Sequence, residues 1–401
     1  LKTVCLRKPR VQKPRVFILS VLLLDNRDMR KDRLTQSLQA LTGILLVALL
    51  MSSCRDTALV KEDQFRVIGY FSGPTSMVDS FEVEKLTHLI FCFGHLKGNR
   101  LDIGSAGDSA TIEKMVGLKK RNPELKVMLS LGGWTGCEPC SDVFNTVEGR
   151  NEFAASLKEL TDYFHTDGFD LDWEYPVIPG PPGHPYRDED RDNVTLLMKS
   201  IREACGDDFD ISIAAGGFRT FIDKSLDWTN VVKYTDFINL MTYDLIHGYS
   251  RISGHHTPLF STPQQTESTD HAVQMLITKG VPKNQIVIGA VTYGRFFQME
   301  VDSLVDLYAP CHFLYGFPYK RMQDSLAPER GFTILWDSVA QAPYALNQDR
   351  NILATYEDER SMALKTKYAI DQGLGGIMFW QLCDDKPKGG LLEVIDGVKG
   401  E

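Results

Sequence analysis

The sequence lacks several features that would place a protein in a class at once. Its eight cysteines are scattered along 401 residues, too few for a small fold held by disulfide bonds. It has no internal repeat and no low-complexity tract. The segment after its first predicted strand, "GYFSGPTS", is not a glycine-rich phosphate-binding turn. A hydrophobic content of 43% and a charged content of 24% are ordinary for globular domains.

Excess positive charge is missing from most of the chain. The net charge is -9, yet residues 1–53 hold ten Lys or Arg and only three Asp or Glu, so the remainder carries a charge of -16. Such an acidic body lacks the basic face that nucleic-acid binding requires. We therefore expect no nucleic-acid partner, whereas a neutral polymer such as a polysaccharide is compatible with this charge.

The pattern of a metal site is also missing. Cys137 and Cys140 form the only close cysteine pair, and no second CxxC or histidine pair stands nearby to complete a zinc site. A disulfide within this loop is the first expectation, followed by two free thiols and then a metal. The adjacent histidines of "GHHTPL" (254–259) have no spaced third ligand. We expect no metal ion and no cofactor.

A long apolar run lies near the N-terminus. In residues 29–54, a basic segment after Met29 precedes an apolar stretch too short to span a bilayer comfortably, which is typical of a secretory signal peptide. Cys54 directly after this stretch resembles a bacterial lipobox, in which the cysteine becomes the lipid-modified first residue. We expect an exported lipoprotein, periplasmic or on the cell surface, that touches the membrane only through its lipid. The alternative is an ordinary signal peptide with an incidental cysteine and a secreted product.

Eight apolar, β-branched runs alternate with helix-like stretches along the rest of the chain. They are residues 66–71, 87–93, 126–132, 168–174, 210–216, 236–243, 285–293 and 375–380. Such alternation implies parallel strands with helical crossovers, and eight of them predict an α/β fold, a (β/α)8 TIM barrel. A doubly wound open sheet is the alternative, but the missing phosphate turn disfavours it.

The gap between the seventh and eighth runs is too long for one helix. Residues 295–374 contain short strand-like segments and a helical stretch from about Asp358 to Gln372, so we predict a small α+β insertion there. The barrel then comprises residues 65–294 and 375–401. The remaining parts are an upstream extension plus signal peptide (1–53) and a lipid-anchored linker (54–64).

The most informative segment is "DGFDLDWEYP", at the fourth predicted strand. Asp170, Asp172 and Glu174 alternate, so on a strand they share one face, while Leu171 and Trp173 share the other. Three buried carboxyls are costly unless protons are shared or hydrogen bonds are supplied, and close like charges raise at least one pKa. This arrangement favours an acid that stays protonated near neutral pH. The alternative is a solvated acidic edge with chance alternation.

These residues resemble a known signature. The segment matches the DxxDxDxE motif of the family 18 glycoside hydrolases, the chitinases and their relatives, at Asp167, Asp170, Asp172 and Glu174. Further similar segments follow in the family's order: "SLGGW" (130–134), "MTYD" (241–244), "YGR" (293–295), "YEDERSM" (356–362) and Trp380. The resemblance covers about residues 65–395 and implies a chitinase-like protein of the subfamily A type, with its inserted module.

The resemblance also implies catalytic roles. Glu174 would be the general acid, and the substrate's own acetamide oxygen would be the nucleophile, with retention of the β anomer. Asp172 would orient the acetamide and share a proton with Asp170, while Tyr243 would hold the acetamide oxygen. Because the attack is intramolecular, no protein nucleophile is required.

Other residues are implied to bind substrate or to support the site. We expect Trp380 under the sugar and Trp134 at a further subsite, with barrel core as the alternative for each. Four more residues are expected to line the cleft, although Met241 could instead pack in the core: Tyr70, Met241, Asp244 and Arg295. Structural support is expected from Asp167, Ser130, Gly132 and Gly133. An extra residue before His247 departs from the family pattern and leaves its role open.

The implied function is hydrolysis of β-1,4 bonds at N-acetylglucosamine in chitin or chito-oligosaccharides by a monomer. One alternative is an endo-β-N-acetylglucosaminidase that cuts the chitobiose core of N-glycans, a group that typically lacks the insertion. The other is a sugar-binding lectin, a group that typically loses the glutamate present here as Glu174. The choice between endo and exo action stays open.

Overall fold

The computed structural model describes residues 65–300 and 305–400. The predicted signal peptide, Cys54 and the linker lie outside these residues, so export and lipid attachment stay predictions. Within the described ranges, no helix combines the length and the apolar character needed to cross a membrane.

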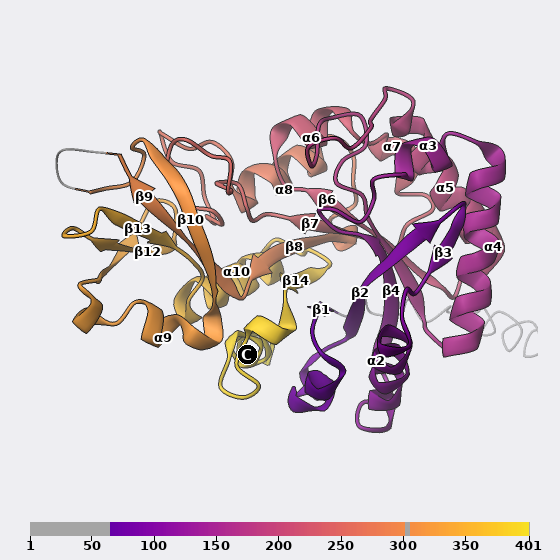
Figure 1. Cartoon of the computed structure of the whole chain (residues 1–401), viewed down its shortest axis with the longest axis horizontal. Coiled ribbons are helices and arrows are strands. Elements are labelled where there is room, and N and C mark those ends of the chain that lie inside the picture. The colour runs from indigo at the N-terminus through magenta and orange to yellow at the C-terminus, as the bar shows by residue number, and fades with distance from the viewer. Residues whose placement is uncertain (1–64, 301–304, 401) are drawn as a thin grey trace, which may run out of the picture. The chain divides into compact units, whose positions relative to one another are not determined.

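Eight parallel strands close into a barrel (Figure 1). They are β1 (Arg66–Phe71), β2 (His88–Lys97), β4 (Lys126–Gly132), β5 (Gly168–Asp172), β6 (Asp210–Gly216), β7 (Phe237–Met241), β8 (Ile286–Val291) and β14 (Gly376–Trp380). Closure comes from β1, which pairs with both β2 and β14. A short strand, β3 (Arg100–Asp102), extends β2 in antiparallel fashion. The TIM-barrel prediction is confirmed.

Helices surround the barrel strands. They are α2 (Ala106–Gly117), α3 (Cys140–Phe144), α4 (Val147–Phe164), α5 (Asp190–Cys205), α6 (Arg219–Lys224), α7 (Trp228–Val231), α8 (Thr269–Thr278), α10 (Glu359–Asp371) and α11 (Leu391–Lys399). The start of α2 is set by a capping box, in which Ser105 accepts from the Asp108 N–H and the Asp108 side chain accepts in return. This cap begins the helix ahead of the apolar pattern that marks it in the sequence.

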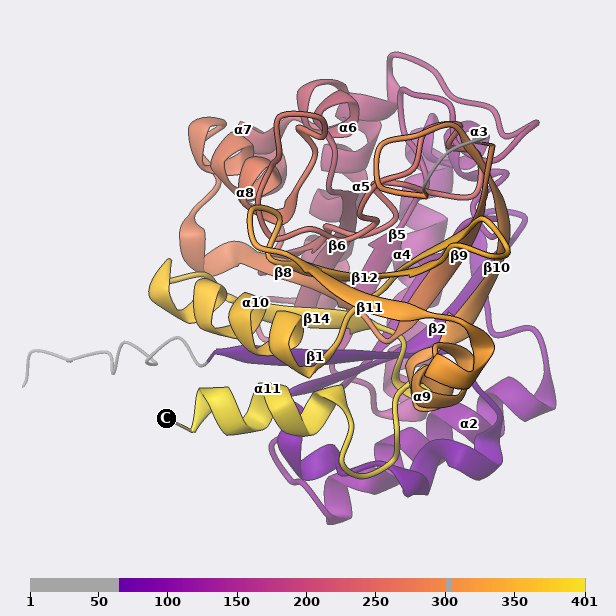
Figure 2. The same cartoon turned by 90° about the vertical axis from the view of Figure 1, so that its left-hand side faces the viewer.

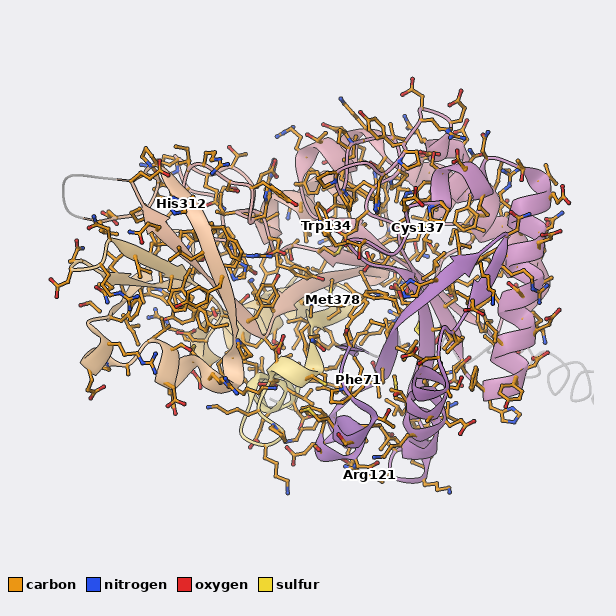
Figure 3. The ribbon with its side chains drawn as sticks, in the orientation of Figure 1. Phe71, Arg121, Trp134, Cys137, His312 and Met378 are labelled. Carbon is orange, nitrogen blue, oxygen red and sulfur yellow. A yellow bond between two sulfur atoms is a disulfide. The ribbon has the colours of Figure 1, made fainter. Side chains whose placement is uncertain are left out.

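The strands separate two packed cores, as the period-two pattern predicts. Leu171 and Trp173 point outward into the layer between strands and helices. Tyr70, Met128 and Met378 point inward and pack with Trp380 inside the barrel. Figure 3 shows Met378 among the barrel strands.

A second sheet, antiparallel throughout, stands between β8 and α10. It contains β9 (Tyr293–Met299), β10 (Cys311–Pro318), β11 (Thr333–Asp337), β12 (Ala342–Asn347) and β13 (Ile352–Thr355), in the order β10-β9-β13-β12-β11, with the short helix α9 (Met322–Ser325). Figure 2 shows this sheet from its outer side. The sheet is consistent with the predicted insertion. Helix α10, which the sequence boundaries place in the insertion, packs on β8, β14 and α11 of the barrel.

Candidate active site

Asp170 lies at the centre of a hydrogen-bond network inside the barrel. The strand register sets it opposite Ser130 of β4 and Ser212 of β6. Its Oδ1 accepts from Ser212 (2.6 Å) and Asn239 (3.1 Å). Its Oδ2 accepts from Ser130 (3.0 Å) and Tyr70 (3.1 Å). Burial raises the pKa of Asp170, and these four hydrogen bonds oppose that rise. The network therefore fixes the position of this carboxyl without any ligand.

Asp172 is the next inward-facing residue and has a different environment. It is buried, and its Oδ1 has no hydrogen-bond partner among the described residues. Burial first, and then the charges of Glu174 and Asp170, raise its pKa well above the usual range. This carboxyl is therefore favoured in its neutral, protonated form, and one of its oxygens has no donor among the described residues.

Glu174 lies beyond the end of β5, which stops at Asp172 rather than at residue 174 as predicted. Pairing ends because the neighbouring strand turns away at two glycines. Gly132 has a φ of 122°, and a Cβ there would lie 2.0 Å from the carbonyl oxygen of Asp172. The N–H of Gly133 then donates to that same oxygen (2.9 Å). Only glycine allows the backbone of β4 to come this close to the Asp172 carbonyl oxygen. Because strand pairing ends here, Glu174 lies at the barrel rim.

The environment of Glu174 suits proton donation. Burial, together with the charge of Asp244, raises its pKa to about 7, and a hydrogen bond with Tyr175 opposes the rise. A carboxyl with this pKa can both give and take a proton near neutral pH. The carboxyls of Asp170 and Asp172 are thus buried, whereas the carboxyl of Glu174 is partly exposed and can exchange protons.

Aromatic rings form a floor beside the acids. Trp380, at the end of β14, is stacked on Phe93 with ring centroids 5.6 Å apart, and it contacts Tyr70 at 5.8 Å. A Cβ on Gly133 would lie 2.6 Å from the Phe93 ring, so this glycine makes room for the stack. Trp380 is partly exposed, and it therefore presents an apolar face next to the carboxyls.

The end of β7 supplies two further predicted residues. Met241 is 8% exposed and packs in the barrel interior beside Tyr243. Burial first, and then Tyr293, Asp172 and Glu174, raise the pKa of Tyr243 well above its usual range. The hydroxyl of Tyr243 is therefore neutral, and it lies close to Asp172 and Glu174.

Asp244 joins the barrel to the inserted sheet. It has a φ of 52° and accepts from Arg295 of β9 through both oxygens (2.6 and 2.5 Å) and from the Tyr293 hydroxyl (2.7 Å). Its pKa is lowered although burial opposes this, chiefly by the bonds from His256 and Arg295. Such a bidentate pair is directional, so it orients β9 relative to the segment that follows β7.

With this geometry established, comparison with known proteins identifies the family. The model of glycosyl hydrolases family 18 matches residues 66–385. The chain belongs to this family. Among its relatives, chitinase A1 of Niallia circulans is 32% identical over 315 residues, which cover 73% of this chain and 44% of that protein. Chitotriosidase-1 of Mus musculus is 28% identical over 327 residues, covering 76% and 68%. The chain thus spans less than half of the Niallia protein.

Solved structures of the family agree with the barrel. A family 18 N-acetylglucosaminidase from Paenibacillus barengoltzii matches with a TM-score of 0.74 and 31% identity, covering 83% of this chain and 99% of that one. The group IV chitinase of Ostrinia furnacalis in complex with allosamidin matches with a TM-score of 0.77 and 25% identity, covering 83% and 98%.

Two predicted residues of this family 18 chain lie away from the acids. Asp167 stands at the opposite end of β5, where its Oδ2 accepts from the Val127 N–H (2.7 Å) and pairs with Lys119 (2.6 Å). Trp134 lies on the loop after β4, 40% exposed, with Tyr175 and Tyr249 each 6.3 Å away between ring centroids. Figure 3 shows Trp134 above Met378, outside the strands.

The structure also places the close cysteine pair and the adjacent histidines, the candidate metal ligands of the sequence. Cys137 and Cys140 are joined by a disulfide bond in the loop after Trp134. His255 contacts Asp337 of the inserted sheet (3.1 Å), while His256 places its Nδ1 3.5 Å from Asp244. The two neighbouring histidines therefore face different carboxylates.

Several site residues were not found from the sequence. They are Phe93, Tyr175, Ser212, Asn239 and Tyr293, all of which contact an acid or the aromatic floor. Ser212 and Asn239 left a usable signal, because each is a lone polar residue at an inward position of an apolar strand. Tyr175 and Tyr293 lie within the quoted segments "DGFDLDWEYP" and "YGR", which could have pointed to them. Phe93 left no signal, since a ring near a strand end is as typical of core as of a cleft.

Proposed function

We propose that this family 18 chain hydrolyses β-1,4 bonds at N-acetylglucosamine in chitin or chito-oligosaccharides, with retention and without a protein nucleophile. The observation that carries the proposal is the buried Oδ1 of Asp172, which has no partner among the described residues, next to a glutamate with a raised pKa. Buried polar atoms are nearly always hydrogen-bonded, so an unpaired one at a rim is suited to a ligand group. An acetamide N–H has the required chemistry.

In the proposed reaction, Glu174 protonates the glycosidic oxygen, and the substrate's acetamide oxygen attacks the anomeric carbon. Asp172 shares its proton with Asp170, so that it can accept the acetamide N–H as a carboxylate and stabilise the cationic oxazolinium ion, while Tyr243 donates its hydroxyl to the attacking oxygen. Glu174 then removes a proton from a water molecule, whose oxygen attacks the anomeric carbon and opens the oxazolinium ring. The β anomer is thereby retained. Intramolecular attack draws on a high effective molarity, so the protein mainly orients and protonates.

Substrate contacts are proposed on the same basis. The partly exposed face of Trp380 would stack on the sugar in the cleaved subsite, and exposed Trp134 would take a sugar further along the chain. Arg295 and Asp244 would keep the inserted sheet against the cleft. Met241, Ser130, Gly132 and Gly133 would support these groups rather than touch the substrate.

A defined N-acetylglucosamine hexamer tests the proposal. We expect shorter oligomers by mass spectrometry and an initial β anomer by proton NMR. The matched control is the same hexamer without its N-acetyl groups, which should not be cut because it lacks the nucleophile. Equal turnover of the two hexamers would contradict the mechanism.

One observation favours a second activity, the release of single N-acetylglucosamine residues. The chain is 31% identical to a solved family 18 N-acetylglucosaminidase, and the match covers 99% of that protein. Monomer as the first product of the hexamer would select this activity over endo cleavage. A high-mannose glycoprotein tests N-glycan cleavage, and binding of the hexamer without any products would instead indicate a lectin.

We also propose that the protein is exported and carries lipid on Cys54. The support is the basic and apolar pattern of residues 29–54, which lie outside the described part of the chain. Mass spectrometry of the mature protein, purified after expression of the full chain, should find a lipid-modified Cys54 as its first residue. A Cys54→Ala variant should lose the lipid and leave the membrane fraction; unchanged membrane association would count against the anchor.

A further inference from the structure

Helix α10, on the outside of the barrel, carries a lysine with no exposed surface. The side chain of Lys365 is paired with Glu357, whose side chain is 1% exposed. The three N–H groups of a lysine are all used here: they donate to Glu357 Oε1, to Thr257 Oγ1 and to the Thr257 carbonyl oxygen (2.7 Å). Lysine and glutamate are almost never buried this completely, so the pair needs an explanation.

Net stability does not provide that explanation. Burial lowers the pKa of Lys365 and raises the pKa of Glu357, so both charges are held against a desolvation penalty. Replacing such a buried pair by apolar residues is often neutral or stabilising in other proteins, because the attraction between the charges only offsets their desolvation. A buried pair of this kind can instead serve to fix one geometry.

The contacts of the pair lead to the active site. The Thr257 hydroxyl has two acceptors within reach, Glu357 Oε1 (3.1 Å) and the carbonyl oxygen of Thr242 (3.2 Å), which directly precedes Tyr243. Because the lysine already donates to that Oε1, the hydroxyl proton is available to the Thr242 carbonyl. Thr242 is itself bonded on its other side, since its hydroxyl donates to the Gly289 carbonyl (2.7 Å) and accepts from the Gly289 N–H (3.1 Å). A continuous set of hydrogen bonds thus runs from α10 to the backbone that carries Tyr243.

The segment that holds Thr257 is bonded on the other side of Tyr243 as well. The His256 carbonyl accepts from the Leu245 N–H (3.0 Å), and the His256 N–H donates to Thr355 of β13 (3.1 Å). The backbone on both sides of Tyr243 is therefore fixed by the segment that Lys365 holds.

We propose that Lys365 and Glu357 are positioning residues for the hydrolysis, acting through Thr257 and Thr242 to hold the Tyr243 hydroxyl where the acetamide oxygen must be bound. The inference rests on the proposed function, which gives Tyr243 its role. Reacting groups must be placed to within a fraction of an ångström, and a misplacement of about 1 Å can lower a rate about a hundredfold. A positioning role therefore affects kcat more than KM.

The main test replaces both charges at once, with Glu357→Gln and Lys365→Met in one variant, so that no lone charge is left buried. On the hexamer we expect kcat to fall about tenfold to a hundredfold, with KM changed less than about threefold, because orientation rather than binding is lost. The melting temperature should stay close to that of the wild type. The matched control is Asp371→Asn with Lys367→Met, which removes an exposed pair from the same helix (2.9 Å) and should leave kcat unchanged.

A second pair of variants decides the question if the double variant does not fold. Thr257→Val removes the hydroxyl between Lys365 and Thr242 with little change in shape, whereas Thr257→Ser keeps it. We expect kcat to fall about tenfold in the valine variant and to recover in the serine variant. A purely structural role predicts equal kcat for both folded variants.

The outcomes separate this inference from the proposed function. If the wild type does not cut the hexamer, the proposed function fails and the positioning role fails with it. If the wild type cuts the hexamer but the folded double variant, or Thr257→Val, keeps the wild-type kcat, only the positioning role is overturned. A lower kcat in the control variant as well would also overturn it, because the effect would then not depend on the buried contacts.

Discussion

Asp170 and Asp172 are two positions apart on one strand and face the same interior, yet the protein treats them differently. Asp170 receives four hydrogen bonds from side chains of four strands. Asp172 has an oxygen with no donor from the described residues. The barrel thus supplies the hydrogen bonds of the first carboxyl, whereas one oxygen of the second has none from the described residues.

The difference separates a carboxyl that the fold holds in place from a carboxyl that keeps free bonding capacity. Donors around a buried carboxyl stabilise its charge and restrict its position, which gives the site a rigid base. A carboxyl without such donors keeps a raised pKa and free bonding capacity, which a reaction can use. The boundary between the two regions falls between Asp170 and Asp172, one side-chain layer below the rim.

The largest expected effect is at the rim. Glu174→Gln removes the transferable proton with almost no change in shape, and we expect kcat on the hexamer to fall about a thousandfold, within the range of general acid catalysis. The melting temperature should not fall, since Glu174 is partly exposed and outside the Asp170 network. Asp167→Asn is the matched control from the same sequence motif and should keep kcat, because Asp167 lies at the other end of β5. A Glu174→Gln variant with full activity would remove the assigned acid.

The comparison itself is tested by Asp170→Asn and Asp172→Asn. The first places an amide N–H₂ against side-chain donors and should lower the free energy of unfolding by about 3 kcal/mol, since buried groups lose their partners. The second should leave stability unchanged or higher but lower kcat about a hundredfold, because an amide cannot give up a proton to Asp170 and become the anion that stabilises the transition state. Urea unfolding and hexamer kinetics measure both. Equal losses of stability would mean that the two carboxyls are not different in kind.

Much of the barrel was predictable because its signals are local. Apolar runs bounded by turns located all eight strands, three of them with the observed ends, and the motif placed Asp170 and Asp172 inward. The ends of β5 and α2 were less predictable because other contacts set them. Strand β5 ends where β4 turns away from it at Gly132 and Gly133, and α2 begins at the capping box of Ser105.

The candidate site was predictable only as far as its motif residues. The donors to Asp170 come from four different strands, and their convergence depends on the barrel register rather than on any one segment. The link from Lys365 to Thr242 joins residues 123 positions apart and leaves no periodic signal. Such long-range contacts follow from the closed topology, so they require the structure.

The pH profile sharpens the comparison with a smaller effect. Glu174, with a pKa of about 7, must be protonated to act as the acid. The value of kcat/KM should therefore be level below pH 7 and fall about tenfold per unit well above it. Tyr175→Phe removes the hydrogen bond that lowers this pKa, so the fall should move to higher pH. Asp244→Asn removes a charge that raises the pKa, so the fall should move to lower pH. Identical profiles for all three proteins would exclude Glu174 as the titrating group.

The smallest expected effect is that of Trp134, which lies outside the hydrogen-bond network of Asp170. Trp134 is 40% exposed and contacts only the rings of Tyr175 and Tyr249 among the described aromatic residues, so its removal should not disturb Asp170 or Asp172. Trp134→Ala should raise KM for the hexamer about fivefold, the scale of one lost aromatic contact, and leave kcat within about twofold. Trp134→Phe, which keeps an aromatic face, should restore most of the affinity. A fall in kcat with KM unchanged would instead place Trp134 among the groups that act on the reacting atoms, further out from Asp170 than this comparison puts them.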